Sequence, residues 1–161
     1  MVESPEVIVV GVDGSEPSRA ALRYAASDAV RRGALLRVVA AFESAGVFGA
    51  RYSVPIPVSD ETIAHKIELE TRALLKEVLD TLPAAPSVDI VVRPGPTGSV
   101  LVDESRRADH LVVGHRGLGD LTSFLLGSSG LHCVLHAHCT VTVVRHAESD
   151  DPVTATGSSI I

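Results

Sequence analysis

The chain is poor in the residues that mark several classes of protein. Of its 161 residues, 2 are cysteines and 3% are aromatic, and tryptophan is absent. Two cysteines are too few for a disulfide framework, so Cys133 and Cys139 are expected to be reduced thiols. The scarcity of aromatic rings leaves little for stacking on bases, and the core must consist mainly of aliphatic side chains.

The chain also lacks a basic surplus and a long apolar run. Its formal net charge is -6, which disfavours nucleic acid as a partner, because binding a long polyanion usually needs a clustered basic face. The first residues have neither the basic residues nor the apolar stretch of a secretory signal, and no run approaches the length of a membrane span. We therefore expect a cytoplasmic protein without a membrane partner.

Apolar runs alternate with amphipathic segments along the chain. The apolar runs predict strands at residues 7–12, 35–42, 88–92, 111–113 and 141–145. Helical periodicity with caps and stops predicts helices over 15–33, 59–83, 97–107 and 127–137. Strands that alternate with helices pair in parallel through right-handed crossovers, so the predicted fold is a three-layer α/β/α arrangement around a parallel sheet.

The domain organisation follows from length and composition. A chain of 161 residues fits one domain, predicted over 7–146, after a short N-terminal extension at 1–6. Residues 147–161 are rich in serine, aspartate, threonine and glycine and are expected to form a disordered tail. Residues 43–60, with two glycines and two prolines, are expected to form a loop without regular structure. This loop is predicted to fold over a ligand as a lid, with mobility alone as the alternative.

A glycine-rich turn follows the fourth predicted strand and opens the last helix. Backbone N–H groups in such a turn can approach an anion without interference from Cβ atoms, and a helix N-terminus adds unsatisfied donors and about half a positive charge. The turn therefore predicts a phosphorylated ligand. Its residues are Gly114, His115, Arg116 and Gly117, followed after nine residues by Gly127 and Ser128.

The topology places a second segment beside this turn. In open α/β sheets, ligands lie beyond the carboxyl ends of the strands where the strand order reverses. If the strand order is 3-2-1-4-5, Asp13 after the first strand and Gly114 after the fourth meet at one crevice.

Three segments together resemble the universal stress protein family: Gly11-Val-Asp13-Gly-Ser15, the run Ala108 to Gly114, and the spacing G-x2-G-x9-G-S. The resemblance covers residues 7–145. It implies a five-stranded parallel sheet of order 3-2-1-4-5, as in adenine nucleotide alpha hydrolase-like folds. It also implies a homodimer, often built through the last strand. In members with the glycine motif, it further implies ATP with Mg²⁺ at the point where the strand order reverses.

The resemblance also implies residue roles. Asp13 would meet the adenine edge, Ala41 would line the base pocket through its backbone, and the remaining positions would hold ribose and phosphates: Gly114, Gly117, Gly127 and Ser128. Apart from the resemblance, Arg116 and His115 lie inside the glycine turn and are the nearby candidates for neutralising phosphate charge, with solvent exposure as the alternative. The family often continues Gly-Ser-Val-Ser, whereas this chain reads Gly127-Ser128-Ser129-Gly130, so one serine hydroxyl is absent and Ser129 is expected to compensate. Losing one hydrogen bond costs about 0.5–1.5 kcal/mol, which weakens ATP binding without excluding it.

The chemistry favours binding over catalysis. The chain has no G-x-x-x-x-G-K-[ST] motif, hence no P-loop lysine, and no hydrolase elbow, so no catalytic residue is predicted and any ATP hydrolysis should be slow. His132 and His136 share a helical face, but a metal site there is disfavoured. The predicted function is a nucleotide-dependent regulator of a stress response with an unknown protein partner. The alternatives are an interaction module with an empty pocket and a sensor of cyclic AMP.

Overall fold

The centre of the molecule is a parallel sheet. The computed structural model describes residues 4–116 and 126–145. Its five strands have the order β3-β2-β1-β4-β5, and every neighbouring pair is parallel, which confirms the predicted topology. Gly117 and the predicted tail at 147–161 lie outside the described residues. The strands are β1 (Val7–Gly11), β2 (Leu35–Phe42), β3 (Ser87–Pro94), β4 (His110–Gly114) and β5 (Thr140–Val144).

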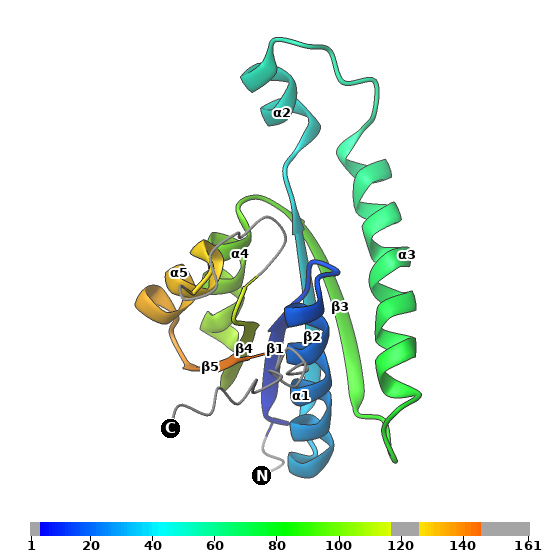
Figure 1. Ribbon diagram of the computed structural model, residues 1–161, viewed down its shortest axis with the longest axis vertical. Helices are drawn as coiled ribbons and strands as arrows, with labels where there is room; N and C mark the ends of the chain where they lie inside the picture. The colour runs from blue at the N-terminus through cyan, green and yellow to red at the C-terminus, as the bar shows by residue number, and fades with distance from the viewer. Residues whose placement is uncertain (1–3, 117–125, 146–161) are drawn as a thin grey trace, which may run out of the picture.

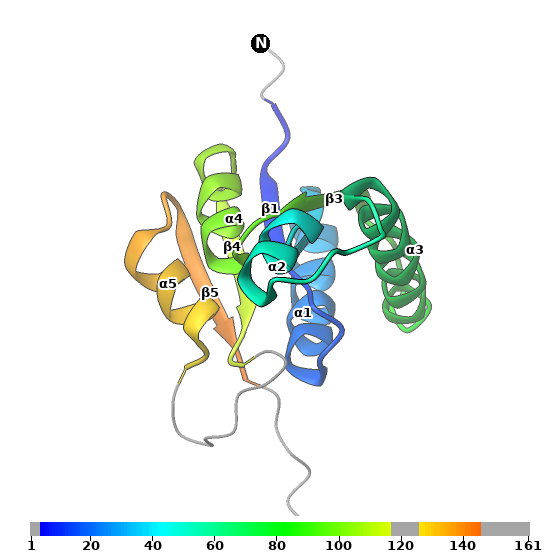
Figure 2. The ribbon, with the colours of Figure 1, turned by 90° about the horizontal axis from the view of Figure 1, so that it is seen from above.

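Helices cover both faces of this sheet. Figure 2 shows α1 and α3 on one face and α4 and α5 on the other, which confirms the three-layer arrangement. None of the helices in the described ranges is long and apolar enough to cross a membrane. The helices are α1 (Glu16–Arg32), α2 (Ala45–Tyr52), α3 (Asp60–Leu79), α4 (Thr97–Glu104), which runs on into a 3₁₀ turn at Ser105–Arg107, and α5 (Ser128–His136).

Alternate residues of the central strands point into two separate cores. Ile8 and Val10 of β1 pack with α1 and α3, whereas Val9 packs with α4 and α5. All three side chains are fully buried. A strand that is covered on both faces needs apolar residues at every position, because its side chains alternate between the faces. This explains the uninterrupted apolar run at the start of the chain.

Helix α1 has the start and stop signals that its sequence predicts. The Ser15 hydroxyl accepts a hydrogen bond from the Ser18 N–H at 3.3 Å, and Pro17 lies in the first turn. Gly33 ends the helix with a φ of 64°, and its N–H donates to the carbonyls of Ala29 and Val30. A left-handed residue at this position closes the helix without steric cost only when it is glycine.

The expectation that residues 43–60 lack regular structure is wrong for part of this segment, because Ala45–Tyr52 form α2. Ser44 caps α2, Ser53 ends it with a φ of 53°, and the Asp60 carboxylate accepts from the Ala45 N–H at 2.7 Å. None of the residues in α2 is buried, and Figure 1 shows it standing above the carboxyl ends of the strands. Two features explain why the sequence does not predict α2. Its eight residues include two glycines and show little helical periodicity, and the Asp60 carboxylate that stabilises its start comes 15 residues later in the chain than Ala45.

Candidate functional site

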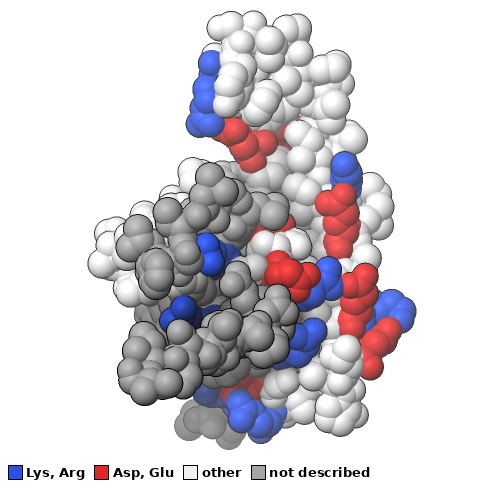
Figure 3. Space-filling model, viewed as in Figure 1, with Lys and Arg blue, Asp and Glu red and all other residues white. Residues whose placement is uncertain are grey.

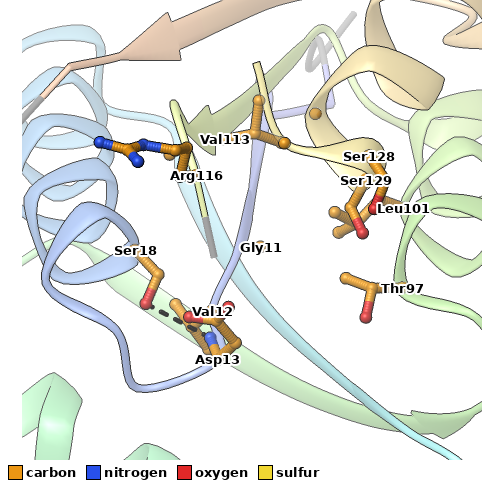
Figure 4. A pocket seen from close by; sticks show the side chains of 13 residues that line it. Gly11, Val12, Asp13, Ser18, Thr97, Leu101, Val113, Arg116, Ser128 and Ser129 are labelled. Atoms are coloured by element: carbon orange, nitrogen blue, oxygen red, sulfur yellow. Dashed lines mark hydrogen bonds between the residues drawn. The ribbon is translucent and has the colours of Figure 1, made fainter. Parts of the chain in front are cut away.

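A cavity of about 340 Å³ opens beyond the carboxyl ends of β1 and β4, where the strand order reverses. We call it the α5 cavity, because the start of α5 forms one of its walls (Figure 4). The ends of β1 and β4, the start of the glycine turn, the first turn of α1 and the start of α4 form the rest. The cavity brings together these predicted residues: Asp13, Gly114, Arg116, Gly127, Ser128 and Ser129.

A second cavity, of about 510 Å³, lies between the end of β2, the β1–α1 turn and α3, and we call it the α3 cavity. Ala41 lines the α3 cavity and not the α5 cavity, and it also lines a third cavity beneath α2. Val12 and Asp13 line both the α5 cavity and the α3 cavity, so these two adjoin. Every predicted site residue in the described ranges therefore lies on one of two adjoining cavities. Gly117 is outside those ranges.

Asp13 lies where the two cavities meet, and the β1–α1 turn fixes its carboxylate. Its Oδ1 accepts from the N–H of Ser15 at 3.0 Å and from the hydroxyl of Ser15 at 2.5 Å. The Asp13 N–H donates to the Ser18 hydroxyl at 3.3 Å, as Figure 4 shows. Gly14 has a φ of 82°, which lets the chain turn sharply here. The carboxylate thus both closes the turn and borders the site.

Two of the glycines around the α5 cavity have close neighbours, of which those of Gly114 are backbone atoms. A Cβ at Gly114 would lie 2.7 Å from both the carbonyl carbon and the carbonyl oxygen of Pro17, in the first turn of α1. A Cβ at Gly130 would lie 2.9 Å from Leu126 Cδ1. A side chain at position 130 would therefore require the end of the flexible Leu126 side chain to move. Ser129, expected to compensate, does line the cavity.

The helices differ in how their N-termini are satisfied. Ser15, Ser44 and Ser59 cap α1, α2 and α3 with side-chain hydrogen bonds. Helices α4 and α5 begin after Pro96 and Gly127 without a side-chain cap, and neither has an acidic residue in its first turn. Both of these starts border the α5 cavity. Their first N–H groups and helix dipoles therefore favour an anion in this cavity.

Charge separates the two cavities. Asp13 and Arg116 are the charged residues in the lining of the α5 cavity within the described ranges. Among the described residues, Asp13, Glu70 and Glu77 border the α3 cavity with Arg19 as the one cation, and Arg19 is paired with Glu77. In Figure 3, charged side chains lie along α3, whereas the surface at α2 is mostly uncharged. A phosphate is therefore repelled from the α3 cavity and better accommodated in the α5 cavity.

Other candidate chemical groups lie outside these cavities. His132 and His136 on α5 stack with ring centroids 4.6 Å apart. In the part of the chain that the structure describes, no group of three or more His, Cys, Asp or Glu side chains is arranged to hold a metal ion. Burial raises the pKa of the Cys133 thiol to about 11, so this thiol is protonated at neutral pH and is a poor nucleophile.

Two lining residues with polar side chains were not predicted from the sequence. Ser18 faces the α5 cavity from α1, and Thr97 faces it from the start of α4. Thr97 follows Pro96 at a recognisable helix start, so its place at a helix N-terminus was readable. The sequence does not show that this helix start faces the glycine turn, because that arrangement depends on how α4 and α5 pack.

The model of the universal stress protein family matches residues 5–145. A universal stress protein of Mycobacterium tuberculosis is 30% identical over 150 residues, which cover 91% of this chain and 50% of the relative. One from Thermus aquaticus is 28% identical over 142 residues, which cover 87% of this chain and 98% of the relative. The chain thus spans about half the length of the mycobacterial relative and nearly all of the Thermus one.

Solved structures show the same fold. A universal stress protein in complex with cAMP has a TM-score of 0.60 at 24% identity, with 89% of this chain and 98% of that chain covered. A member from Arabidopsis thaliana with AMP bound has a TM-score of 0.59 at 19% identity, with 93% and 98% covered.

Proposed function

Because this chain belongs to the universal stress protein family, we propose that it binds ATP, with Mg²⁺ on the phosphates, across the α5 cavity and the α3 cavity. The observation that carries the proposal is the start of α5. It lines a cavity at the point where the strand order reverses, begins without a cap and has no acidic residue in its first turn. An anionic group of the ligand would satisfy these donors.

The two cavities suggest how the nucleotide lies. The phosphates belong in the α5 cavity, against Ser128, Ser129 and the glycine turn, with Arg116 nearby. The base belongs in the α3 cavity, where Asp13 and the Ala41 backbone border it. The acidic border of the α3 cavity favours the hydrogen-bond donors of a base and disfavours phosphate. The junction at Asp13 would then face the sugar and the edge of the base.

The ligands of solved relatives support the ligand class. One solved universal stress protein is a complex with cAMP and another has AMP bound, and both ligands are adenine nucleotides. Cyclic AMP is therefore the second candidate ligand, since one phosphate can be held by α5 alone.

Magnesium would be held mainly by the phosphates and water. Among the described residues Asp13 is the single carboxylate that lines the α5 cavity, and the turn already uses its Oδ1. Mg²⁺ commonly keeps several waters and takes few protein ligands when it accompanies nucleotide phosphates. The metal would supply charge neutralisation along the phosphate chain.

We propose a regulatory role in a stress response rather than turnover. No lysine or arginine other than Arg116 lines the α5 cavity in the described ranges, so transition-state charge would be poorly neutralised and hydrolysis slow. A protein partner would respond to nucleotide occupancy. A homodimer through β5 fits the position of this strand at the sheet edge, where unpaired backbone groups otherwise favour association. Cytoplasmic placement remains part of the proposal.

Calorimetric titration of nucleotide-stripped protein with ATP and Mg²⁺ tests the proposal, using Ser129→Asp and Ser129→Asn. The aspartate would complement the α5 dipole and repel phosphate, so we expect affinity to fall about a hundredfold with the melting temperature unchanged or raised. The asparagine, which is similar in shape and neutral, should bind within about fivefold of the wild type. Absence of micromolar binding to the wild-type protein would overturn the proposal, and tighter binding of cyclic AMP in competition would favour the second candidate.

A further inference from the structure

The side chain of Thr97 reaches the α5 cavity from an element that the glycine turn does not include. Figure 4 shows Thr97 on the same side of the cavity as Ser128 and Ser129, with Asp13 and Ser18 on the other side. Thr97 is the first residue of α4, and Ser128 is the first residue of α5. Two helix starts with hydroxyl side chains therefore border one cavity.

The hydroxyls around the cavity differ in whether the fold already uses them. The Ser18 hydroxyl donates to the Ser15 carbonyl at 3.0 Å and accepts from the Asp13 N–H. The Thr97 hydroxyl forms no hydrogen bond with any other residue in the ranges that the structure describes, and the same holds for Ser129. Thr97 and Ser129 thus have donors available for a ligand, whereas Ser18 supports the turn.

The α4–α5 contact fixes the position of Thr97. Gly98 packs against His132 of α5, and a Cβ at position 98 would lie 3.0 Å from His132 Cβ. Gly98, Val100 and Leu101 are buried, so the first turn of α4 is held against the second core. The Thr97 hydroxyl is therefore presented from a rigid support, which reduces the entropy that a ligand contact would cost.

We infer that Thr97 is a specificity-determining residue, which together with the uncapped first turn of α4 binds a second phosphoryl group of the nucleotide while α5 binds another. The inference rests on the proposed nucleotide function. A ligand with one phosphate can use the donors of one helix start, whereas a chain of two or three phosphates can use both. The chain would therefore distinguish adenine nucleotides by phosphate number and prefer ATP and ADP to AMP and cyclic AMP.

This assignment gives the chain a hydroxyl in place of the one missing at position 130. A side chain at Gly130 would need the end of the Leu126 side chain to move, and this chain has glycine there. Thr97 provides a hydroxyl at the same cavity from the facing helix.

The test is calorimetric titration of the full chain with ATP, ADP, AMP and cyclic AMP, each with Mg²⁺. The variants are Thr97→Val, which keeps the shape and removes the hydroxyl, and Thr97→Ser, which keeps the hydroxyl. Ser99→Ala is the control, because Ser99 is exposed on the same helix turn and does not line the cavity. We expect Thr97→Val to weaken ATP and ADP binding about tenfold and to leave AMP and cyclic AMP within about twofold. Thr97→Ser and Ser99→Ala should bind as the wild type does.

The outcomes separate this inference from the function on which it rests. If the wild-type protein binds adenine nucleotides and Thr97→Val binds all of them equally well, Thr97 has no role and the proposed function stands. If Thr97→Val weakens all four ligands alike, the discrimination by phosphate number is wrong. If the wild-type protein binds none of the four at micromolar concentrations, both proposals fail. Circular dichroism melting of each variant establishes that the fold is retained.

Discussion

The two ends of the parallel sheet are built in opposite ways. At the amino end, polar side chains bind the backbone and one another. The Asp109 carboxylate accepts a hydrogen bond from the backbone N–H of Val7 at 2.8 Å. The buried Asp28 carboxylate is paired with Arg31 at 2.7 Å and with Arg32 at 2.8 Å. The carboxyl end has glycines and cavities instead. Two helices begin there without a side-chain cap, which leaves backbone N–H donors of their first turns unused. The fold therefore pairs charged groups with one another at one end and keeps donors available for a ligand at the other.

A buried polar cluster extends the amino end to the edge strand. His110 Nδ1 lies 3.8 Å from Asp28 Oδ2, and His110 Nε2 lies 2.6 Å from the Thr142 hydroxyl oxygen. These residues belong to α1, β4 and β5. Their contacts hold the end of α1 and the edge strand β5 to the same residue of β4.

Removing the carboxylate of Asp28 should give the largest loss of stability. Asp28→Ala removes a buried carboxylate that two arginines and a buried histidine share, so we expect the free energy of unfolding to fall by about 3 kcal/mol. Urea unfolding measures this loss, and Asp28→Asn should lose less because it keeps the volume and part of the hydrogen bonding. ATP affinity should not change, since Asp28 is at the other end of the sheet. A loss below about 1 kcal/mol would show that this cluster does not hold the amino end together.

A methyl group at Gly114 should disturb the carboxyl end through packing. In Gly114→Ala the new Cβ would meet backbone atoms of Pro17, so α1 must shift and we expect a loss of about 2 kcal/mol together with weaker ATP binding. Gly11→Ala is the matched control, because its Cβ would lie 2.7 Å from the movable Leu101 side chain. The control should lose less stability in the same thermal and urea unfolding measurements. Equal losses would contradict the distinction between backbone and side-chain neighbours.

An exposed ion pair should have the smallest effect. A hydrogen bond from Arg93, with its charge, holds the pKa of Asp103 below the ordinary 3.8. A carboxyl with a depressed pKa in the folded state stabilises the protein above its unfolded pKa and loses this effect as pH falls through the folded pKa. We expect Asp103→Asn to be slightly less stable than the wild type at pH 7, with the difference shrinking as the pH falls below about 4.

Urea unfolding of both proteins across pH 2–7 measures this difference. A difference that stays constant over the range would mean that the charge of Asp103 contributes nothing and that its contribution is one of packing alone.

Local patterns were sufficient to predict the sheet and most of its helices. Strand order followed from the family resemblance, and the cap at Ser15 and the stop at Gly33 are where the sequence placed them. The structure extends the third predicted strand to Ser87–Pro94 and ends α4 at Glu104. Such shifts at element ends reflect pairing and packing, which neighbouring residues in the sequence do not encode.

The unpredicted features depend on contacts between distant segments. Helix α2 is supported by the Asp60 carboxylate, and Thr97 joins the cavity because Gly98 lets α4 pack against α5. The family resemblance implied that Ala41 lines a base pocket, and the structure puts it on the α3 cavity, which Asp13 also lines. Residue types and spacings indicated the glycine turn, whereas the facing wall of the cavity depends on tertiary packing.

The pairing of β1 with β4 has a consequence for folding. Ile8 of β1 is opposite His110 of β4, 102 residues later, whereas β1 and β2 belong to one strand–helix–strand unit. Closing the longer loop costs more chain entropy, so β1, α1 and β2 can associate before β4 reaches them. Asp13 comes from the early unit, and Gly114 and Ser129 come from the late one. The candidate site therefore lies between the early unit and the strands that join it later. A nucleotide bound there would contact both parts of the sheet and stabilise their association.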